Sequence, residues 1–250
     1  MENLTNQNYF SNHSPPRISM PGIVNRKRRA SGAVSKPKRK QPFTPSYMTK
    51  IPRNAVRLGS GFPKKMRQQM SYHDVFLMAS NAGSTAERQF KLNGLFDPDV
   101  AIGGHQPLYF DQMMGIYNHF HVVGCKATVT AQPYDSNTSP AKIVIWQNDD
   151  TTNSSGTWNT RAEYPKASSG VTEGDNKLKF TLPWSAKGTF GGDILANNSL
   201  QGTASGDPTE LSILQITVQS ADNVSTTNTI IHVKLEYTVW FTEVKDILTS

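Results

Sequence analysis

The side chains best suited to binding chemistry are cations gathered near the N-terminus. Arg26-Lys27-Arg28-Arg29 and Lys36-Pro37-Lys38-Arg39-Lys40 place eight Lys or Arg within fifteen residues. Dense positive charge binds phosphate by releasing condensed counterions, and it needs no fixed geometry. We therefore predict that point charges contact nucleic-acid phosphates without base readout. The predicted residues are Arg26, Lys27, Arg28, Arg29, Lys36, Lys38, Arg39, Lys40, Lys50, Arg53 and Arg57.

The same two clusters match the Lys/Arg runs of nuclear-import signals. One extended segment can serve import first and nucleic-acid binding later, because both functions need exposed positive charge. The predicted nuclear-localisation residues are Arg26, Lys27, Arg28, Arg29, Lys36, Pro37, Lys38, Arg39 and Lys40.

The net charge of +7 hides an uneven distribution along the chain. Residues 1–70 hold 15 Lys or Arg and one acid, a net charge of +14, whereas residues 71–250 hold 11 Lys or Arg and 18 acids, a net charge of −7. The first segment is also rich in Pro and poor in periodic apolar residues, so alone it cannot offset its chain entropy. We predict a disordered basic arm over residues 1–68 and a folded domain over residues 69–250.

A membrane surface is the other polyanion that such an arm could meet. Binding there requires an amphipathic helix with a bulky apolar face. Four prolines at positions 37, 42, 45 and 52 interrupt any such helix. The sequence also lacks a run of about 18 apolar residues, so no membrane insertion is predicted.

His119 and His121 are the candidates for metal chemistry in the folded domain. Two residues apart in a strand, both rings would lie on one face. Metal-binding jelly rolls of the cupin kind use such a pair together with a nearby Glu and a later His. Here the next Glu is Glu163, and His232 is the candidate third ligand. We predict no metal, and a pair of polar side chains at an interface or on a sheet face.

Other side chains that could be reactive lie in contexts typical of structural roles. Cys125 is in an apolar strand without a neighbouring base, which predicts a buried inert thiol. Asp149-Asp150 and Gly103-Gly104 have the surroundings of turns. No cofactor and no enzymatic activity are predicted. The tryptophans are predicted core or interface anchors, with base stacking open to any that faces nucleic acid: Trp146, Trp158, Trp184 and Trp240.

The pattern of the folded domain is that of short strands between polar loops. The predicted strands are 73–79, 88–95, 120–131, 141–147, 177–184, 211–220 and 229–243, with a short extra strand near Thr189. A short helix is predicted over 106–118, with Pro107 at its start. The segments 135–140, 149–156, 168–176 and 197–208 are predicted loops. Long connections favour one all-β, eight-stranded jelly-roll sandwich over a short-loop meander.

Residues 90–129 carry a resemblance to a known family. Phe90-Lys91-Leu92-Asn93-Gly94-Leu95-Phe96-Asp97-Pro98 leads into Gly103-Gly104-His105-Gln106-Pro107-Leu108. Phe110-Asp111-Gln112-Met113 and Tyr117-Asn118-His119-Phe120-His121-Val122-Val123-Gly124 follow. This block resembles the capsid proteins of circovirus-like viruses, which have circular single-stranded DNA.

That resemblance implies a capsid protein that assembles with itself into a small icosahedral shell, of the 60-copy T=1 kind. It implies a single-stranded DNA genome packaged by the basic arm and host nuclear-import receptors that recognise the same arm. A host cell receptor, unidentified, is a further implied partner. The implied locations are the virion and, during assembly, the host nucleus.

Three alternatives stay open on the sequence alone. One is the coat protein of a small RNA virus, because phosphate contacts do not distinguish RNA from DNA. The second is a nuclear single-strand-binding regulator whose β-sandwich is an interaction module. The third is a cupin-like enzyme with a metal at His119 and His121.

Overall fold

The computed structural model describes residues 61–101, 103–135, 139–152 and 156–246. Every residue predicted for nucleic-acid binding or nuclear import lies outside these ranges, so those assignments stay predictions. Strand β1 begins at Lys65, inside the segment assigned to the arm from the sequence.

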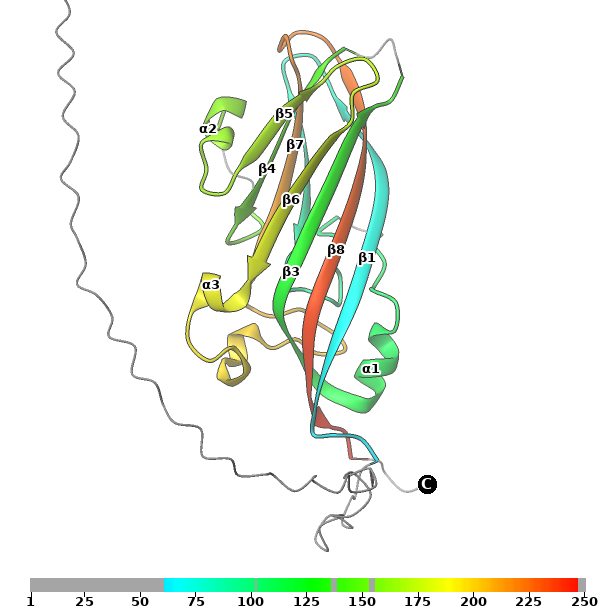
Figure 1. Cartoon of the computed structure of the whole chain (residues 1–250), viewed down its shortest axis with the longest axis vertical. Helices are drawn as coiled ribbons and strands as arrows, with labels where there is room; N and C mark the ends of the chain where they lie inside the picture. The colour runs from blue at the N-terminus through cyan, green and yellow to red at the C-terminus, as the bar shows by residue number, and fades with distance from the viewer. Residues whose placement is uncertain (1–60, 102, 136–138, 153–155, 247–250) are drawn as a thin grey trace, which may run out of the picture. The chain divides into compact units, whose positions relative to one another are not determined.

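Eight strands form two four-stranded antiparallel sheets (Figure 1). The first sheet has the order β1-β8-β3-β6, and the second has the order β2-β7-β4-β5. The strands are β1 (Lys65–Ser80), β2 (Thr85–Lys91), β3 (Tyr117–Pro133), β4 (Ala141–Asn148), β5 (Ser168–Thr172), β6 (Leu178–Ser185), β7 (Ile213–Ser220) and β8 (Thr227–Val244).

This strand order is that of a jelly roll. The chain passes from one sheet to the other at every connection except β4 to β5, which are neighbours in the second sheet. The first and last strands, β1 and β8, pair along their length, from Lys65 opposite Thr242 to Ser80 opposite Thr227. Eight strands arranged in two Greek keys define the jelly roll. The predicted fold class is confirmed.

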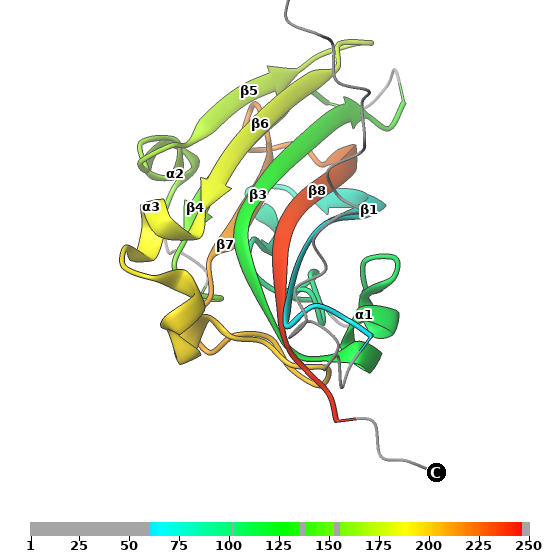
Figure 2. The ribbon, with the colours of Figure 1, turned by 60° about the horizontal axis from the view of Figure 1, so that its bottom comes forward.

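Alternation along the strands builds the core between the sheets. In β6, Phe180 and Trp184 are buried while Lys179 and Thr181 are exposed. In β8 every odd position from 231 to 241 is buried, and the even positions point away from the core. Figure 2 shows the four strands of the first sheet side by side, with β4 and β7 of the second sheet behind them. Each large side chain buried this way contributes about 1.5–3 kcal/mol.

The eighth strand is not where the sequence predicted it. The residues near Thr189 form helix α3 (Ala186–Phe190), because the Ser185 side chain accepts a hydrogen bond from the Gly188 amide, 3.2 Å away, and caps a helical turn. Strand β5 instead lies at 168–172, in a segment predicted as a loop. Its sequence, Ser-Ser-Gly-Val-Thr, lacks an apolar pattern, and it is held by pairing with β4.

The predicted helix over 106–118 is α1 (Phe110–Ile116), one turn shorter at its start. Tyr109 precedes it with a left-handed φ of 71°, which ends the preceding segment abruptly. Phe110 and Met114 are the helix residues that enter the core. The sequence did not predict α2 or the short 3₁₀ turns. These elements are α2 (Trp158–Ala162), η2 (Ile194–Ala196) and η3 (Asn198–Leu200).

Strand β3 contains a bulge that decides which way its side chains point. Its register with β8 shifts between Val122 and Gly124, where β3 carries an extra residue. His119 and His121, before the bulge, therefore share the outward face with Lys126 after it, although their numbers differ in parity. The bulge keeps one continuous polar face across the whole length of the strand.

Candidate functional site

The outward face of the first sheet carries an excess of positive charge. Strand alternation points five cations outward from its four strands. Among the described positions of this face lie two acids, Glu236 and also Glu243, whose carboxylate is close to His119. Lys234 Nζ lies 2.8 Å from the Glu236 carboxylate, and both side chains are about half exposed. The five cations are Lys65, Arg67, Lys126, Lys179 and Lys234.

Two of these cations extend the basic segment onto the sheet. Lys65 lies opposite Thr242, and Arg67 lies opposite Trp240, both at the start of β1. They belong to the charge-rich N-terminal region of the sequence, yet the structure places them in a paired strand. The positive charge of that region therefore continues onto the folded domain.

The two candidate metal ligands on β3 have different surroundings. His121 is buried, and its pKa is lowered to about 4, because burial disfavours the imidazolium and because His119 and Lys65 add positive charge nearby. The Asp193 carboxylate opposes this shift. His119 Nε2 lies 3.0 Å from the carboxylate of Glu243. His121 is thus a neutral, buried polar side chain at ordinary pH.

His232 is not a third ligand for that pair. His119 lies opposite Thr242 on β8, whereas His232 lies opposite Thr130 at the other end of the sheet. The ten residue-to-residue steps of β8 from His232 to Thr242 span about 33 Å at the usual strand rise. Within the described ranges no group of three or more His, Cys, Asp or Glu side chains could hold a metal ion.

The other reactive side chains adopt the structural roles predicted for them. Cys125 is buried at 4% exposure, and burial raises the pKa of its thiol far above the ordinary value. The Asp150 carboxylate accepts a hydrogen bond from the Thr152 amide at 2.7 Å, which is turn chemistry. Gly103 lies in a turn with φ of 99°, a conformation that favours glycine.

The four tryptophans divide into two pairs. Trp146 and Trp184 are buried, as predicted for core anchors. Trp158 and Trp240 are partly exposed. Trp240 lies on the outward face of the first sheet, between Arg67 on β1 and His121 on β3. It is therefore the tryptophan on the cationic face, which the sequence alone could not select.

Part of the outer face of the second sheet, over its middle strands, is covered by the chain itself. Helix α2 lies against β4, where the rings of Trp146 and Tyr164 stack with centroids 5.8 Å apart. The buried Arg161 guanidinium forms an ion pair with Glu87 at 2.5 Å and donates a hydrogen bond to Thr217 at 3.2 Å. Both faces are buried in the middle of β4 (Ile143–Trp146) and along β7 as far as Val218.

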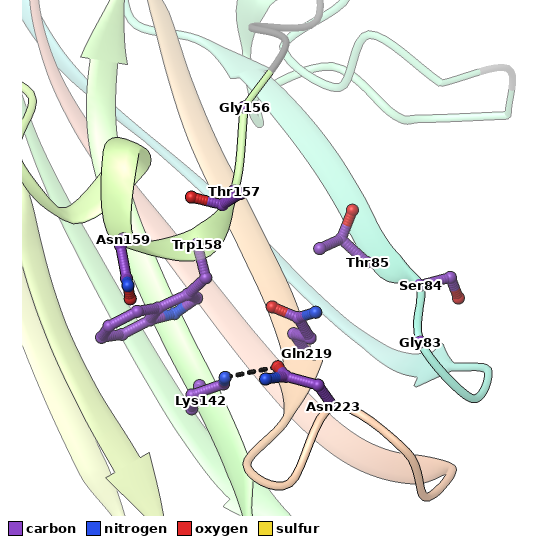
Figure 3. A pocket seen from close by; sticks show the side chains of 10 residues that line it. All are labelled: Gly83, Ser84, Thr85, Lys142, Gly156, Thr157, Trp158, Asn159, Gln219 and Asn223. Carbon is purple, nitrogen blue, oxygen red and sulfur yellow. Dashed lines mark hydrogen bonds between the residues drawn. The ribbon is translucent and has the colours of Figure 1, made fainter.

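A hollow of about 630 Å³ lies at the edge of this cover (Figure 3). Lys142 Nζ donates a hydrogen bond to Asn223 Oδ1 at 2.6 Å and lies 5.6 Å from the centre of the Trp158 ring. The remaining lining groups are hydroxyls, amides and backbone, among them Thr85 and Gln219. Among the described residues that line it, the hollow offers hydrogen-bonding groups and no paired acid and base.

No helix in the described ranges is both long and apolar enough to cross a membrane.

Comparison with known proteins identifies structures of similar fold. No protein-family model and no curated protein matches the chain. The structure of Desmodium yellow mottle tymovirus matches at 14% identity and a TM-score of 0.38, covering 76% of this chain and 94% of its own. The structure of empty-head turnip yellow mosaic virus matches at 12% sequence identity and a TM-score of 0.43, and the match covers 76% of this chain and 86% of the viral chain. The structure of Mud crab tombus-like virus matches at 9% sequence identity and a TM-score of 0.41, and the match covers 89% of this chain and 95% of the viral chain.

The assignment of the fold does not depend on these matches, because the strand order defines the jelly roll. The narrower resemblance of residues 90–129 to circovirus-like capsid proteins stays a prediction.

Proposed function

We propose that this chain is a viral capsid protein whose jelly-roll domain assembles with copies of itself into a closed icosahedral shell. The observation that carries the proposal is the eight-stranded order β1-β8-β3-β6 and β2-β7-β4-β5 in a chain whose first 70 residues hold a net charge of +14. Viral capsids are one of the main uses of this fold. A cationic segment joined to such a domain provides the means of holding a polyanion.

The charge is of the right order for packaging a genome. A shell of about 60 copies, the T=1 arrangement, brings on the order of 840 positive charges from its N-terminal segments. A single strand carries about one negative charge per nucleotide, so a genome of on the order of two thousand nucleotides is partly neutralised. The predicted arm residues from Arg26 to Arg57 supply these contacts in the proposal.

The cargo is proposed as single-stranded nucleic acid. DNA is the form that the resemblance in residues 90–129 requires, together with nuclear import through the clusters at 26–29 and 36–40. RNA is the form that the alternative, the coat of a small RNA virus, requires. Contacts to phosphate are common to both, so the fold and the charge support either cargo equally.

Exposed apolar residues offer contacts between copies. Leu108 and Tyr109, just before α1, are 72% and 64% exposed, and Tyr109 holds a left-handed backbone that a bulky residue adopts at a cost. Val224, in the loop before β8, is 71% exposed. In the proposal these residues are covered by neighbouring subunits.

Electron microscopy and light scattering of the purified full chain test the shell. Closed isometric particles are expected, and a Leu108→Asp variant should form fewer of them, while Lys187→Asp, on the exposed surface of α3, serves as the control. A protein that stays monomeric or dimeric at every salt concentration contradicts the proposal and supports the single-strand-binding regulator instead.

Nuclease digestion of polymer extracted from the particles then decides the cargo. Sensitivity to DNase supports the circovirus-like assignment, and sensitivity to RNase alone supports the RNA-virus alternative. Import is tested separately, by attaching residues 20–45 to a fluorescent protein and comparing its nuclear accumulation with a version in which Lys36, Lys38, Arg39 and Lys40 are changed to Ala.

A further inference from the structure

A groove of about 490 Å³ runs across the outward face of the first sheet. All four strands contribute to it, and its lining residues are polar apart from one valine. They are His73 from β1, Thr128, Thr130 and Gln132 from β3, Lys177 and Lys179 at β6, and His232, Val233 and Lys234 from β8.

Strand register brings these side chains together from distant parts of the sequence. One row across the sheet places His73 beside Lys234, and Lys234 beside Thr128. The next row places His232 beside Thr130, and Thr130 beside Lys179. The rings of His73 and His232 lie 6.3 Å apart between centroids. Each of the two adjacent rows therefore carries one ammonium group, one threonine hydroxyl and one histidine ring.

The groove is cationic because its lining holds three lysines and no acid, although Lys177 also lines an adjoining hollow with Asp135 and Asp175. None of the lining residues, all of them in the described ranges, is acidic. Lys177 and Lys179 form no ion pair with any described residue, whereas Lys234 is bound to Glu236, which lies outside the groove lining. Two unpaired ammonium groups beside hydroxyl and amide donors form a set that suits the oxygen atoms of phosphate diesters.

We propose that this groove binds the phosphodiester backbone of single-stranded nucleic acid, so that the shell domain makes phosphate contacts of its own beside those of the arm. The inference rests on the proposed capsid function and deepens it, because it assigns the β1-β8-β3-β6 face to the genome side of the shell. On the opposite sheet α2 packs against β4, and the hollow beside it is lined by one cation, Lys142, which already donates a hydrogen bond to Asn223.

The salt dependence of binding measures this contribution in the full chain. On a single strand, removing one lysine–phosphate interaction lowers the slope of log K against log salt by about 0.7. The variant K177Q/K179Q/K234Q should therefore bind a fluorescent oligothymidylate with a slope smaller by about 2 in magnitude. The matched control, K142Q/K166Q/K187Q, removes the same charge outside the groove and should leave the slope near that of the unchanged protein.

The variant K177Q/K179Q leaves the Lys234–Glu236 pair intact, so it separates weaker phosphate binding from local disturbance of the sheet. It should lower the slope by about 1.4, and its thermal unfolding should match that of the unchanged protein. Equal slopes for groove and control variants would overturn the inference. So would loss of heparin binding with unchanged oligothymidylate binding, since that result makes the groove a site for sulfated glycans.

Failure of this inference is distinguishable from failure of the proposed function. Particle formation by the unchanged protein tests the shell, and it does not depend on the groove lysines. If particles form and the slopes are equal, the shell stands and the groove assignment alone is overturned.

Discussion

The two sheets of this jelly roll are built from similar strands, but their outer faces differ in how much of them is buried. In β6 of the first sheet, buried and exposed residues alternate, and the exposed ones face away from the core. In β7 of the second sheet, seven of the eight residues are buried, and on the outer side Arg161 of α2 donates a hydrogen bond to Thr217. The chain covers the middle strands of the second sheet with its own residues and leaves the lysine-bearing part of the first sheet exposed and cationic.

This difference indicates where partners bind. On the second sheet, the buried Arg161–Glu87 ion pair and the stacked rings of Trp146 and Tyr164 contribute to stability. A substitution there should lower the free energy of unfolding of the domain. A face of lysines and threonines in solvent tolerates substitution, and changes there alter binding instead. Truncation of the arm and matched substitutions on the two sheets test that division.

The largest expected effect comes from deleting residues 1–40. The deletion removes nine Lys or Arg, so the salt slope for oligothymidylate should fall by about 6 in magnitude. Filter binding at several salt concentrations measures it, and circular dichroism should still show the β fold. The oligothymidylate binding that remains after the deletion gives an upper limit for the contribution of the first sheet. Unchanged binding would refute the assigned role of the arm.

A lysine introduced on the outer face of each sheet should lower the free energy of unfolding by different amounts. Thr217→Lys places a charge at a fully buried position of β7, which costs about 3 kcal/mol or more. Thr181→Lys on β6 adds the same charge at an exposed position and should change stability by less than about 0.5 kcal/mol. Urea unfolding compares the two, and similar losses would contradict the division.

Breaking one ion pair on each sheet is the next test. Arg161→Ala leaves Glu87 without its buried partner and should lower the free energy of unfolding by about 3 kcal/mol. Lys234→Ala breaks an exposed pair with Glu236 and should cost less than about 1 kcal/mol. Chemical denaturation of both variants under the same conditions gives the difference, and equal costs would show that α2 does not seal the second sheet.

The last test is a pH dependence from the buried histidine of β3. The pKa of His121 is lowered from 6.5 to about 4, so between these values the folded state binds fewer protons than the unfolded state. Stability should therefore fall as the pH is lowered from 6.5 to 4. Thermal unfolding of His121→Gln should lack this part of the pH dependence, whereas the control His73→Gln should retain it.

The sequence by itself determined the elements with strong local patterns. The alternating residues of β6 and β8 and the apolar turn of α1 were recognisable without the fold, because period-2 and helical patterns show in adjacent residues. The clustered arm charges were equally visible, since they depend on composition. These patterns were enough for the all-β class and for a jelly roll of eight strands.

Only the tertiary structure decided the rest. Strand β5 has no apolar pattern of its own, and pairing with β4 makes it a strand. The bulge at Val122 and Gly124 turns Lys126 toward the same face as His119. The groove joins His73 to Lys179, more than a hundred positions apart in the chain. Such contacts come from strand pairing between distant segments, and local sequence carries no record of which strands will be neighbours.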